Sequence, residues 1–508
     1  MILLTDLPPE IIHHILAYVD PRDLAWIPRT CKSFCHAVSN NAPLFKRLYL
    51  NHLDPPSQDP ADWEQSLKDL VRLQALSNLD VDAKKDELDF VHRTVTELLE
   101  NASTDGTSQG SAGNIPHSRN ADLLTTVFSS ESNQSAFLCR SFIYERARAE
   151  FHCQDVRYWH GPPKPEHQKS AHLHCLYGVP RLFAYPSARR QTRHNLMHPF
   201  ACSKVYDLRQ YTDKNKWGPF MDDGSMRVDW EKVEAVMITL GSNMDSLGLS
   251  RTYGCDTFCS TPFAGTWANS WRPPPHDPPS PKADHAPKHP DPYGIAGIWM
   301  RVVCFLDYSD FFAFNFGTQE LPPHVPRRSI NMGQATRLIV MSIFVTGVEK
   351  PGPDDGQELP VVHFKGVSRS LDQCFDENAD SDLRGTVRLT PNGDVRWTTF
   401  SIFGGVERWR SESIQVGGVR SAKGVVGHWF DTDFDPHGPA GPTAFWKISE
   451  GSQVPPALGK RGDLVSEVDD LDGFAESSQD QEEGGSIGDY TDGDQGEEVP
   501  SGQSTPEA

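Results

Sequence analysis

The stretch LLTDLPPEIIHHILAYVDPRDLAWIPRTCKSFCHAVSNNAPLFKRLYL, residues 3–50, decides how the chain begins to fold. Apolar side chains recur in it at helical spacing. Asp6 is placed to cap a first helix, Asp20 or Asp23 can begin a second, and Asn-Asn-Ala-Pro at 40–43 separates a last one. The stretch therefore predicts a compact unit of several short helices.

This unit is too small to bury much apolar surface by itself. A chain of about fifty residues leaves a large part of its apolar area exposed unless something packs against it. The residues alone leave two explanations open. The unit is either the first helical layer of a larger domain or a docking module for another protein.

Residues 2–50 resemble the F-box. The resemblance rests on Leu7-Pro8-x-Glu10-Ile11, Ile15-Leu16, Val19-Asp20-Pro21-x-Asp23-Leu24, Cys31-Lys32-Ser33-Phe34 and Leu44-Phe45-Lys46. Pro28 and Thr30 depart from the family pattern, and we expect Pro28 to bend or restart a helix. The resemblance implies a helical bundle that binds the Skp adaptor and, through it, a cullin scaffold. It also implies that the adaptor-facing residues are Leu7, Pro8, Glu10, Ile11, Ile15, Leu16 and Leu24.

Residues 58–151 are predicted to form a helical linker region. Apolar stripes at helical spacing begin at Trp63 and at Leu88, and a third helix is expected over residues 134–151. Residues 101–120 are rich in Ser, Gly and Asn and hold few apolar side chains. Because such a segment cannot bury enough surface to fold, we predict a disordered loop there.

Residues 156–448 are predicted to form a β-rich domain that binds a substrate. Short apolar runs bounded by turn residues predict strands at 205–208, 233–240, 298–306, 311–316, 338–348, 361–364, 419–430 and 443–447. The proline-rich segment 271–292 cannot join a sheet ladder, so we predict an exposed loop. The strand spacing favours an antiparallel barrel or sandwich, and the predicted fold class is α+β.

The clearest local structure is a hairpin in LRGTVRLTPNGDVRWTTFSI, residues 383–402. Asn392-Gly393 suits a two-residue turn, which would place Leu389 opposite Arg396. In that register Trp397 lies on the outer face of the sheet. The buried face would then consist of Val387, Leu389, Phe400 and Ile402.

The net charge of −21 is unevenly distributed along the 508 residues. Residues 451–508 hold 15 acidic and 2 basic side chains with few apolar ones, which predicts a disordered acidic tail. The rest is mildly acidic, which disfavours nucleic acid or an anionic membrane as a partner. No apolar window is long enough to cross a membrane, and the ten cysteines are too scattered for a disulfide framework. We therefore expect a cytoplasmic or nuclear location, or both.

Metal-binding and catalytic patterns are weak in this sequence. Cys255 and Cys259 lack the CxxC spacing and the second cysteine pair of structural zinc sites. Asp431, Asp433 and Asp435 alternate and could hold a cation, but turns capped by Asp side chains explain them better. The sequence holds no GxSxG, phosphate-binding loop or dinucleotide fingerprint. We therefore predict no metal, no cofactor and no catalytic residue.

Aromatic and guanidinium side chains are concentrated near the end of the β domain. These residue types are enriched at binding anchors, and we predict that Arg408, Arg410 and Trp429 contact a protein substrate. The stretch from VDWEKVEAVMITLG to DPHGPAGPTAFWK is similar to the second half of fungal F-box proteins. An F-box followed by a β-barrel is more distantly similar to F-box-only receptors whose barrel holds the substrate.

These resemblances imply a non-catalytic substrate-receptor subunit of a Skp–cullin–F-box ubiquitin ligase. Such a subunit holds its protein substrate near a ubiquitin-charged enzyme, so its contribution is proximity. Two alternatives stay open. One is an F-box scaffold protein that binds the adaptor but no cullin, and the other is a β-barrel enzyme fused to an F-box.

Overall fold

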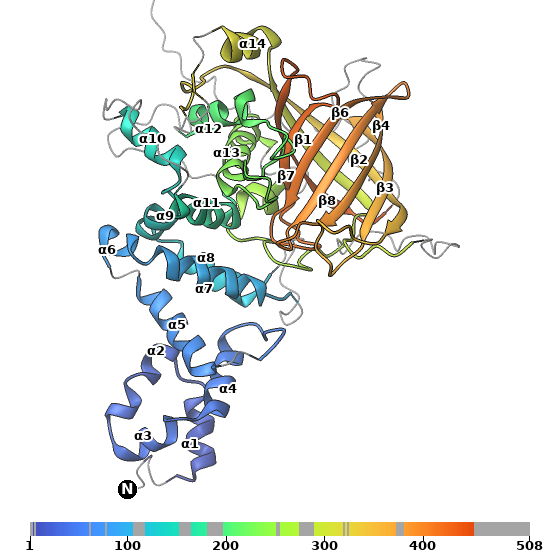
Figure 1. Cartoon of the computed structure of the whole chain (residues 1–508). Coiled ribbons are helices and arrows are strands. Elements are labelled where there is room, and N and C mark those ends of the chain that lie inside the picture. The colour runs from blue at the N-terminus through green and yellow to red at the C-terminus, as the bar shows by residue number, and fades with distance from the viewer. Residues whose placement is uncertain are drawn as a thin grey trace, which may run out of the picture. The chain divides into compact units, whose positions relative to one another are not determined.

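The structure is a computed structural model (Figure 1). It describes residue 4 and residues 7–59, 62–76, 79–104, 117–151, 164–179, 197–249, 255–273, 289–317, 321–322, 325–371 and 380–451. Residues 1–454 form one compact unit. The predicted acidic tail beyond residue 451 and residues 274–288 of the predicted proline-rich loop lie outside the described residues.

Short helices begin the described chain, as the sequence predicts. They are α1 (Pro9–Leu16), α2 (Pro21–Leu24), the 3₁₀ turn η2 (Ile27–Arg29), α3 (Lys32–Val38) and α4 (Ala42–His52). The Asp20 carboxylate caps α2 by accepting a hydrogen bond from the Arg22 backbone N–H at 2.8 Å. Pro28 lies in η2, so it interrupts the α-helical geometry as expected. Asp6, predicted to cap the first helix, lies outside the described residues.

A longer series of helices follows. It consists of α5 (Trp63–Ala75), α6 (Val81–Lys85), α7 (Leu88–Glu100), α8 (Arg119–Val127), α9 (Glu131–Phe137), α10 (Phe142–Phe151), α11 (Pro165–Tyr177), α12 (His198–Val205), the 3₁₀ turn η5 (Leu208–Gln210), α13 (Trp230–Ser246) and the π-turn η7 (Asp256–Ser260). The predicted helix over 134–151 is in fact two helices, α9 and α10. In the part of the chain that the structure describes, no helix is long and apolar enough to cross a bilayer.

The predicted loop at 101–120 is wrong at its end, because Arg119 and Asn120 belong to α8. The buried Asp54 carboxylate accepts hydrogen bonds from both ends of the predicted loop, from the Ser118 hydroxyl at 2.5 Å and from the Ser103 backbone N–H at 3.1 Å. The Asn120 side chain in turn accepts from the Asp54 backbone N–H at 2.8 Å. These partners are more than forty residues apart along the chain, so the local composition does not reveal them. Residues 105–116 of the predicted loop lie outside the described residues.

Eight strands in the described residues close into an antiparallel barrel (Figure 1). Their bounds are β1 (Gly297–Leu306), β2 (Gln334–Glu349), β3 (Val361–Ser370), β4 (Asp380–Leu389), β5 (Val395–Phe403), β6 (Val406–Gln415), β7 (Val425–Asp431) and β8 (Ala440–Ser449). Each strand pairs with its neighbours in sequence, and β8 closes the barrel on β1. The structure therefore confirms an antiparallel barrel and excludes the sandwich alternative. A closed barrel has no exposed sheet edge.

Three predicted strands are helical instead, so the β-rich part begins near residue 297 and not at 156. Residues 205–208 fall at the end of α12 and the start of η5, 233–240 lie in α13, and 311–316 lie in α14 (Tyr308–Phe316). Every residue of α13 from 231 to 241 is buried, because α13 packs against α11, α12, β7 and β8. A helix buried on all sides shows no polar face, so its sequence is easily mistaken for a buried strand.

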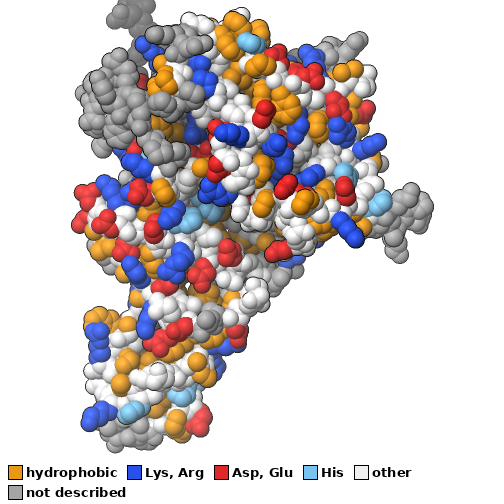
Figure 2. All heavy atoms as spheres, in the orientation of Figure 1, with side chains coloured by type: hydrophobic (Ala, Val, Ile, Leu, Met, Phe, Trp, Pro, Cys, Tyr) orange, Lys and Arg blue, Asp and Glu red, His pale blue; other side chains and the backbone are white. Residues whose placement is uncertain are grey.

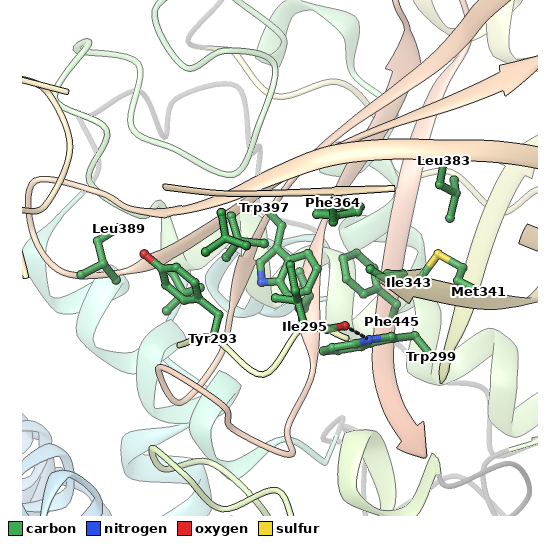
Figure 3. Close-up of a cluster of buried hydrophobic side chains, with 14 residues drawn as sticks. Tyr293, Ile295, Trp299, Met341, Ile343, Phe364, Leu383, Leu389, Trp397 and Phe445 are labelled. Carbon is green, nitrogen blue, oxygen red and sulfur yellow. Dashed lines mark hydrogen bonds between the residues drawn. The ribbon is translucent and has the colours of Figure 1, made fainter. Parts of the chain in front are cut away.

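The barrel interior is filled at one end by a large apolar cluster (Figure 3). The Trp397 ring lies 5.1 Å from Trp299, 5.3 Å from Phe445 and 5.7 Å from Phe364, measured between ring centroids. All four rings are buried. Aromatic rings in such edge-to-face or tilted contacts add about 1 kcal/mol per pair to the free energy of burial.

The predicted register of the β4–β5 hairpin is wrong by one residue. Leu389 pairs with Val395 and Val387 with Trp397, so Trp397 faces the interior and Phe400 faces outward. The cause is a three-residue loop, 391–393, closed by a hydrogen bond from the Thr390 backbone N–H to the Asp394 carbonyl at 2.8 Å. Gly393 has a positive φ of 88°, as such a loop requires. One extra loop residue moves every β5 side chain to the opposite face.

Candidate functional site

The N-terminal helices expose apolar side chains that their own core does not use. Ile11 is 47% exposed, Ile15 40%, Tyr18 65% and Trp26 63%. Ile11 and Ile15 of α1 and Tyr18, in the turn after it, have i, i+4, i+7 spacing, while Ile12 and Leu16 of α1 are buried. Figure 2 shows hydrophobic side chains at the surface of this part of the chain. We call Ile11, Ile15, Tyr18 and Trp26 the exposed apolar set; such a set is typical of a docking surface.

Two of the predicted adaptor-facing residues do not lie on this surface. Leu16 is 3% exposed and Leu24 is 5% exposed, so both stabilise the helical unit from inside. Pro8 and Glu10 are exposed, and Leu7 is half-buried. Sequence reasoning missed Tyr18 and Trp26, although the position of Tyr18 seven residues after Ile11 was a signal for the same face.

A cavity of about 490 Å³ opens at the end of the barrel opposite the apolar cluster. Side chains alternate between the two faces of a strand. Trp299 of β1 therefore shares the interior with Arg301, Val303 and Phe305, and the last three line the cavity. Between the cluster and the cavity the interior is polar. The Ser368 and Ser381 hydroxyls lie 2.7 Å apart within hydrogen-bond distance, and the Thr399 and Ser411 hydroxyls are also hydrogen-bonded.

Arginines dominate the charge of this cavity. Arg301 of β1, Arg337 of β2 and Arg408 of β6 all line it. Arg301 is 5% exposed, and its Nε–H donates to the Thr443 hydroxyl at 3.0 Å. Burial lowers the pKa of the Arg301 guanidinium to about 10, so it stays protonated at neutral pH. The other two guanidiniums contact aromatic rings, Arg337 at 5.3 Å from the Phe305 centroid and Arg408 at 5.1 Å from that of Trp409.

Trp429 of β7, which the sequence predicts to be a binding residue, also lines the cavity. Its indole N–H donates to the Cys304 carbonyl oxygen at 3.1 Å, and its ring meets Trp409 edge to face at 5.3 Å. Gly441 on the neighbouring strand makes room for the indole. A Cβ at that position would lie 2.8 Å from the Trp429 Nε1 and 2.5 Å from the Cys304 oxygen. The ring is therefore held in one orientation against the cavity.

Arg410, the third predicted substrate-binding residue, does not line the cavity. It lies on the outer face of β6, where its guanidinium binds the buried Glu412 carboxylate at 2.5 Å. Glu412 also accepts from Arg396 Nε at 2.9 Å and from the Thr398 hydroxyl at 3.1 Å. The sequence predicted the same binding role for Arg408 and Arg410 because guanidinium groups are enriched at binding anchors. A register shift in the β5–β6 pairing between Ser401 and Ile402 accompanies their separation.

We expect Arg410→Ala to lower the free energy of unfolding by about 2 kcal/mol. The buried Glu412 carboxylate would keep Arg396 but lose its second guanidinium, and incomplete pairing of a buried charge is destabilising. Arg408→Ala removes no ion pair with any described residue and should change the free energy of unfolding by less than about 0.5 kcal/mol. Urea denaturation of both variants is the measurement. Equal losses for the two would contradict the assignment of Arg410 to a structural role.

An exposed aromatic row lies beside the cavity mouth. Tyr308, Phe312 and Phe316 of α14 and His437 follow each other with ring centroids 6.1, 4.8 and 4.7 Å apart. The rings of Tyr308, Phe312 and Phe316 are exposed, and Tyr308 also lines the cavity. Figure 2 shows hydrophobic side chains gathered over α14. Asp307 fixes the start of α14 by accepting from the Ser309 backbone N–H at 2.9 Å.

The candidate metal ligands are arranged for local turns. Asp431 accepts from the Asp433 backbone N–H and Asp435 accepts from that of His437, each at 2.9 Å. These are Asx turns, the alternative that the sequence favoured. In the described residues no group of three or more His, Cys, Asp or Glu side chains is placed to hold a metal ion.

Comparison with known families gives one match. Residues 4–51 match the F-box-like family model. Comparison of the chain with curated proteins and with solved structures gives no significant match. A domain of this family typically acts as a non-catalytic adaptor and binds a Skp-type protein. The short N-terminal helices with their exposed apolar set are therefore an F-box-like domain, the kind of domain that serves as an adaptor in ubiquitin ligation.

Proposed function

We propose that the chain is the non-catalytic substrate-receptor subunit of a Skp–cullin–F-box ubiquitin ligase in the cytoplasm or nucleus. The F-box-like domain binds the Skp adaptor, and the adaptor connects it to the cullin. The barrel recruits a protein substrate, which is then held close to a ubiquitin-charged enzyme. Holding two reactants together is sufficient to accelerate the transfer, so the chain needs no reacting group of its own.

The exposed apolar set of the F-box-like domain carries this proposal. Ile11 and Ile15 are exposed on α1 and Tyr18 in the turn that follows it, although α1 already buries Ile12 and Leu16 against its own domain. Exposed apolar side chains on one helical face are costly in water unless a partner covers them. A Skp-type adaptor is the partner that the family match indicates.

The aromatic row on α14 supports the second half of the proposal. Aromatic side chains supply most binding anchors in protein interfaces, and here three of them are exposed on one short helix at the cavity mouth. They belong to α14, between β1 and β2, and not to the F-box-like domain, so the adaptor and the substrate would contact different residues. Of the three residues predicted to contact the substrate, Arg408 and Trp429 line the cavity beside this row, and Arg410 does not.

The adaptor arm of the test uses the double variant Ile11→Asp with Ile15→Asp in the full chain. Its matched control is Phe344→Asp with Val406→Asp, which places the same charges on two exposed apolar residues of the barrel. Because two central apolar contacts are lost, we expect Skp binding measured by calorimetry to weaken by about a hundredfold or more for the first pair. The control pair should bind as the unmodified chain does.

The same tagged proteins test the substrate and cullin assignments. Phe312→Ser with Phe316→Ser should reduce the proteins that accumulate with the chain under proteasome inhibition, while adaptor and cullin continue to co-purify. Undiminished Skp binding by a folded Ile11→Asp, Ile15→Asp chain would overturn the adaptor-binding face. Co-purification of the adaptor without any cullin would instead favour the cullin-independent scaffold.

A further inference from the structure

Among the described residues, the lining of the barrel cavity holds more positive than negative charge. Three guanidiniums, those of Arg301, Arg337 and Arg408, line it. Asp307 is the only acidic residue among its lining residues in the described chain, and its carboxylate is used to cap α14. Within the same described residues, none of the three arginines forms an ion pair with a carboxylate.

Of the three arginines, Arg301 gives the strongest indication that the cavity binds an anion. Its side chain is buried at the bottom of the cavity, and the Thr443 hydroxyl is a neutral partner for its Nε–H. A buried charge without a counter-charge is unfavourable by several kcal/mol, so folded proteins keep one mainly where a ligand supplies the opposite charge. Guanidinium groups also match the planar oxygen pairs of carboxylate and the oxygens of phosphate.

The rest of the cavity suits an apolar body attached to the anion. Phe305, Ile339, Phe403 and Trp429 contribute carbon surface, and the Ser368 and Ser401 side chains add hydroxyl groups. A volume of about 490 Å³ is in the range of small-molecule sites. The apolar cluster closes the other end of the barrel. A ligand must therefore enter through the cavity mouth and fit within the cavity. An eight-stranded barrel commonly holds a ligand of this kind.

We propose that the barrel cavity binds a free small organic anion, with its carboxylate or phosphate group at Arg301, Arg337 and Arg408 and its apolar body against Phe305 and Trp429. This site is distinct from the adaptor face and from the exposed aromatic row, so it goes beyond the proposed receptor function. A ligand there would lie directly beneath Tyr308, which belongs to both the cavity lining and the aromatic row.

Two fluorescent probes with a common aromatic body test the charge requirement. 1-Anilinonaphthalene-8-sulfonate carries an anionic group, and N-phenyl-1-naphthylamine lacks it. We expect the full chain to bind the sulfonate more tightly. Arg337→Gln with Arg408→Gln should weaken sulfonate binding by about tenfold to a hundredfold, because each lost charge-assisted contact is worth roughly one decade of affinity. Binding of the uncharged probe should change little.

The matched control is Arg369→Gln. Arg369 lies on β3 between two cavity-lining serines, but its side chain points outward and is 71% exposed. It should leave the binding of both probes unchanged. Circular dichroism of each variant establishes that the barrel remains folded. Equal sulfonate affinity for the unmodified chain and a folded Arg337→Gln, Arg408→Gln variant would overturn the proposal.

A competition experiment distinguishes a free small molecule from an anionic group on a protein substrate. Decanoate and 1-naphthyl phosphate should displace the sulfonate probe from the unmodified chain. If neither displaces it while a captured substrate protein does, the cavity belongs to protein recognition and the small-molecule proposal is wrong. Skp binding, measured in parallel, should be unaffected in every variant, so failure here is separable from failure of the proposed function.

Discussion

Replacing Trp397 with alanine is expected to lower the free energy of unfolding by about 4 kcal/mol. The ring is fully buried and contacts Trp299, Phe364 and Phe445. Its indole N–H also donates to the Gln415 side-chain oxygen at 3.2 Å. Truncation therefore removes aromatic contacts, leaves a cavity and deprives a buried acceptor of its donor.

Phe400→Ala is the matched control for Trp397→Ala. Phe400 lies on the same strand but on the outer face, where Arg384 stacks over its ring at 3.9 Å. We expect its loss to lower the free energy of unfolding by only about 1 kcal/mol. The measurement is urea denaturation of both variants, monitored by far-ultraviolet circular dichroism. This signal is used because one of the variants lacks a tryptophan. A larger loss for Phe400→Ala would restore the register predicted from sequence and contradict the structure.

Lys423→Met is expected to raise the free energy of unfolding at pH 7 by about 3 kcal/mol. The Lys423 side chain is fully buried in the β6–β7 connection, and burial lowers its pKa from 10.5 to about 7. The shift corresponds to an unfavourable contribution of up to about 4 kcal/mol at neutral pH. Methionine loses the 2.9 Å hydrogen bond from Lys423 Nζ to the Thr257 carbonyl, which offsets about 1 kcal/mol of the gain.

The stability gained by Lys423→Met depends on pH, and the lowered pKa of Lys423 gives the direction of this dependence. Between about pH 7 and pH 10.5 the unfolded chain holds the Lys423 proton more tightly than the folded chain, so the unmodified protein gains stability as pH rises. The advantage of Lys423→Met should therefore be full at and below pH 7 and disappear toward pH 10.5. Lys365→Met, at an exposed position on β3, should show no such trend in urea denaturation. An advantage that stays constant across this range would contradict the burial of a chargeable amine.

Local sequence signals were sufficient to predict several structural elements. The F-box-like helices are short, punctuated by proline and capped by Asp20 and Asn41, so each boundary is readable from a few neighbouring residues. The strands β1 and β2 are bounded by turn residues and lie close to their predicted positions, whereas the strand predicted at 361–364 covers only the start of β3. The closed barrel was one of two predicted arrangements, and the pairing of β8 with β1 decided between them.

Elements buried on several sides were harder to predict. The helix α13 has no polar stripe, because α11, α12, β7 and β8 cover it together. The helix α14 consists mainly of aromatic residues, whose local preference favours strands. Only its cap at Asp307 identifies it as a helix, and the predicted strand at 311–316 began after that cap.

The candidate site was only partly predictable. Arg408 and Trp429 line the cavity, whereas Arg410 belongs to the Glu412 ion pair on the outer face. Arg301 and Arg337 were not singled out, because they lie on β1 and β2, far from the others in sequence. Charges that meet inside a barrel come from strands spread over more than a hundred residues, and no local pattern connects them.

The sequence by itself determined the F-box-like domain, the α+β composition and the presence of a strand-rich C-terminal part, because these depend on spacing, capping and turn residues within short windows. Only the tertiary structure decided that Trp397 is core and Phe400 is surface, since one additional loop residue reverses both faces of β5. It also decided that Arg301, Arg337 and Arg408 converge on one cavity. Register and closure set the direction of each side chain, and both depend on contacts between distant segments.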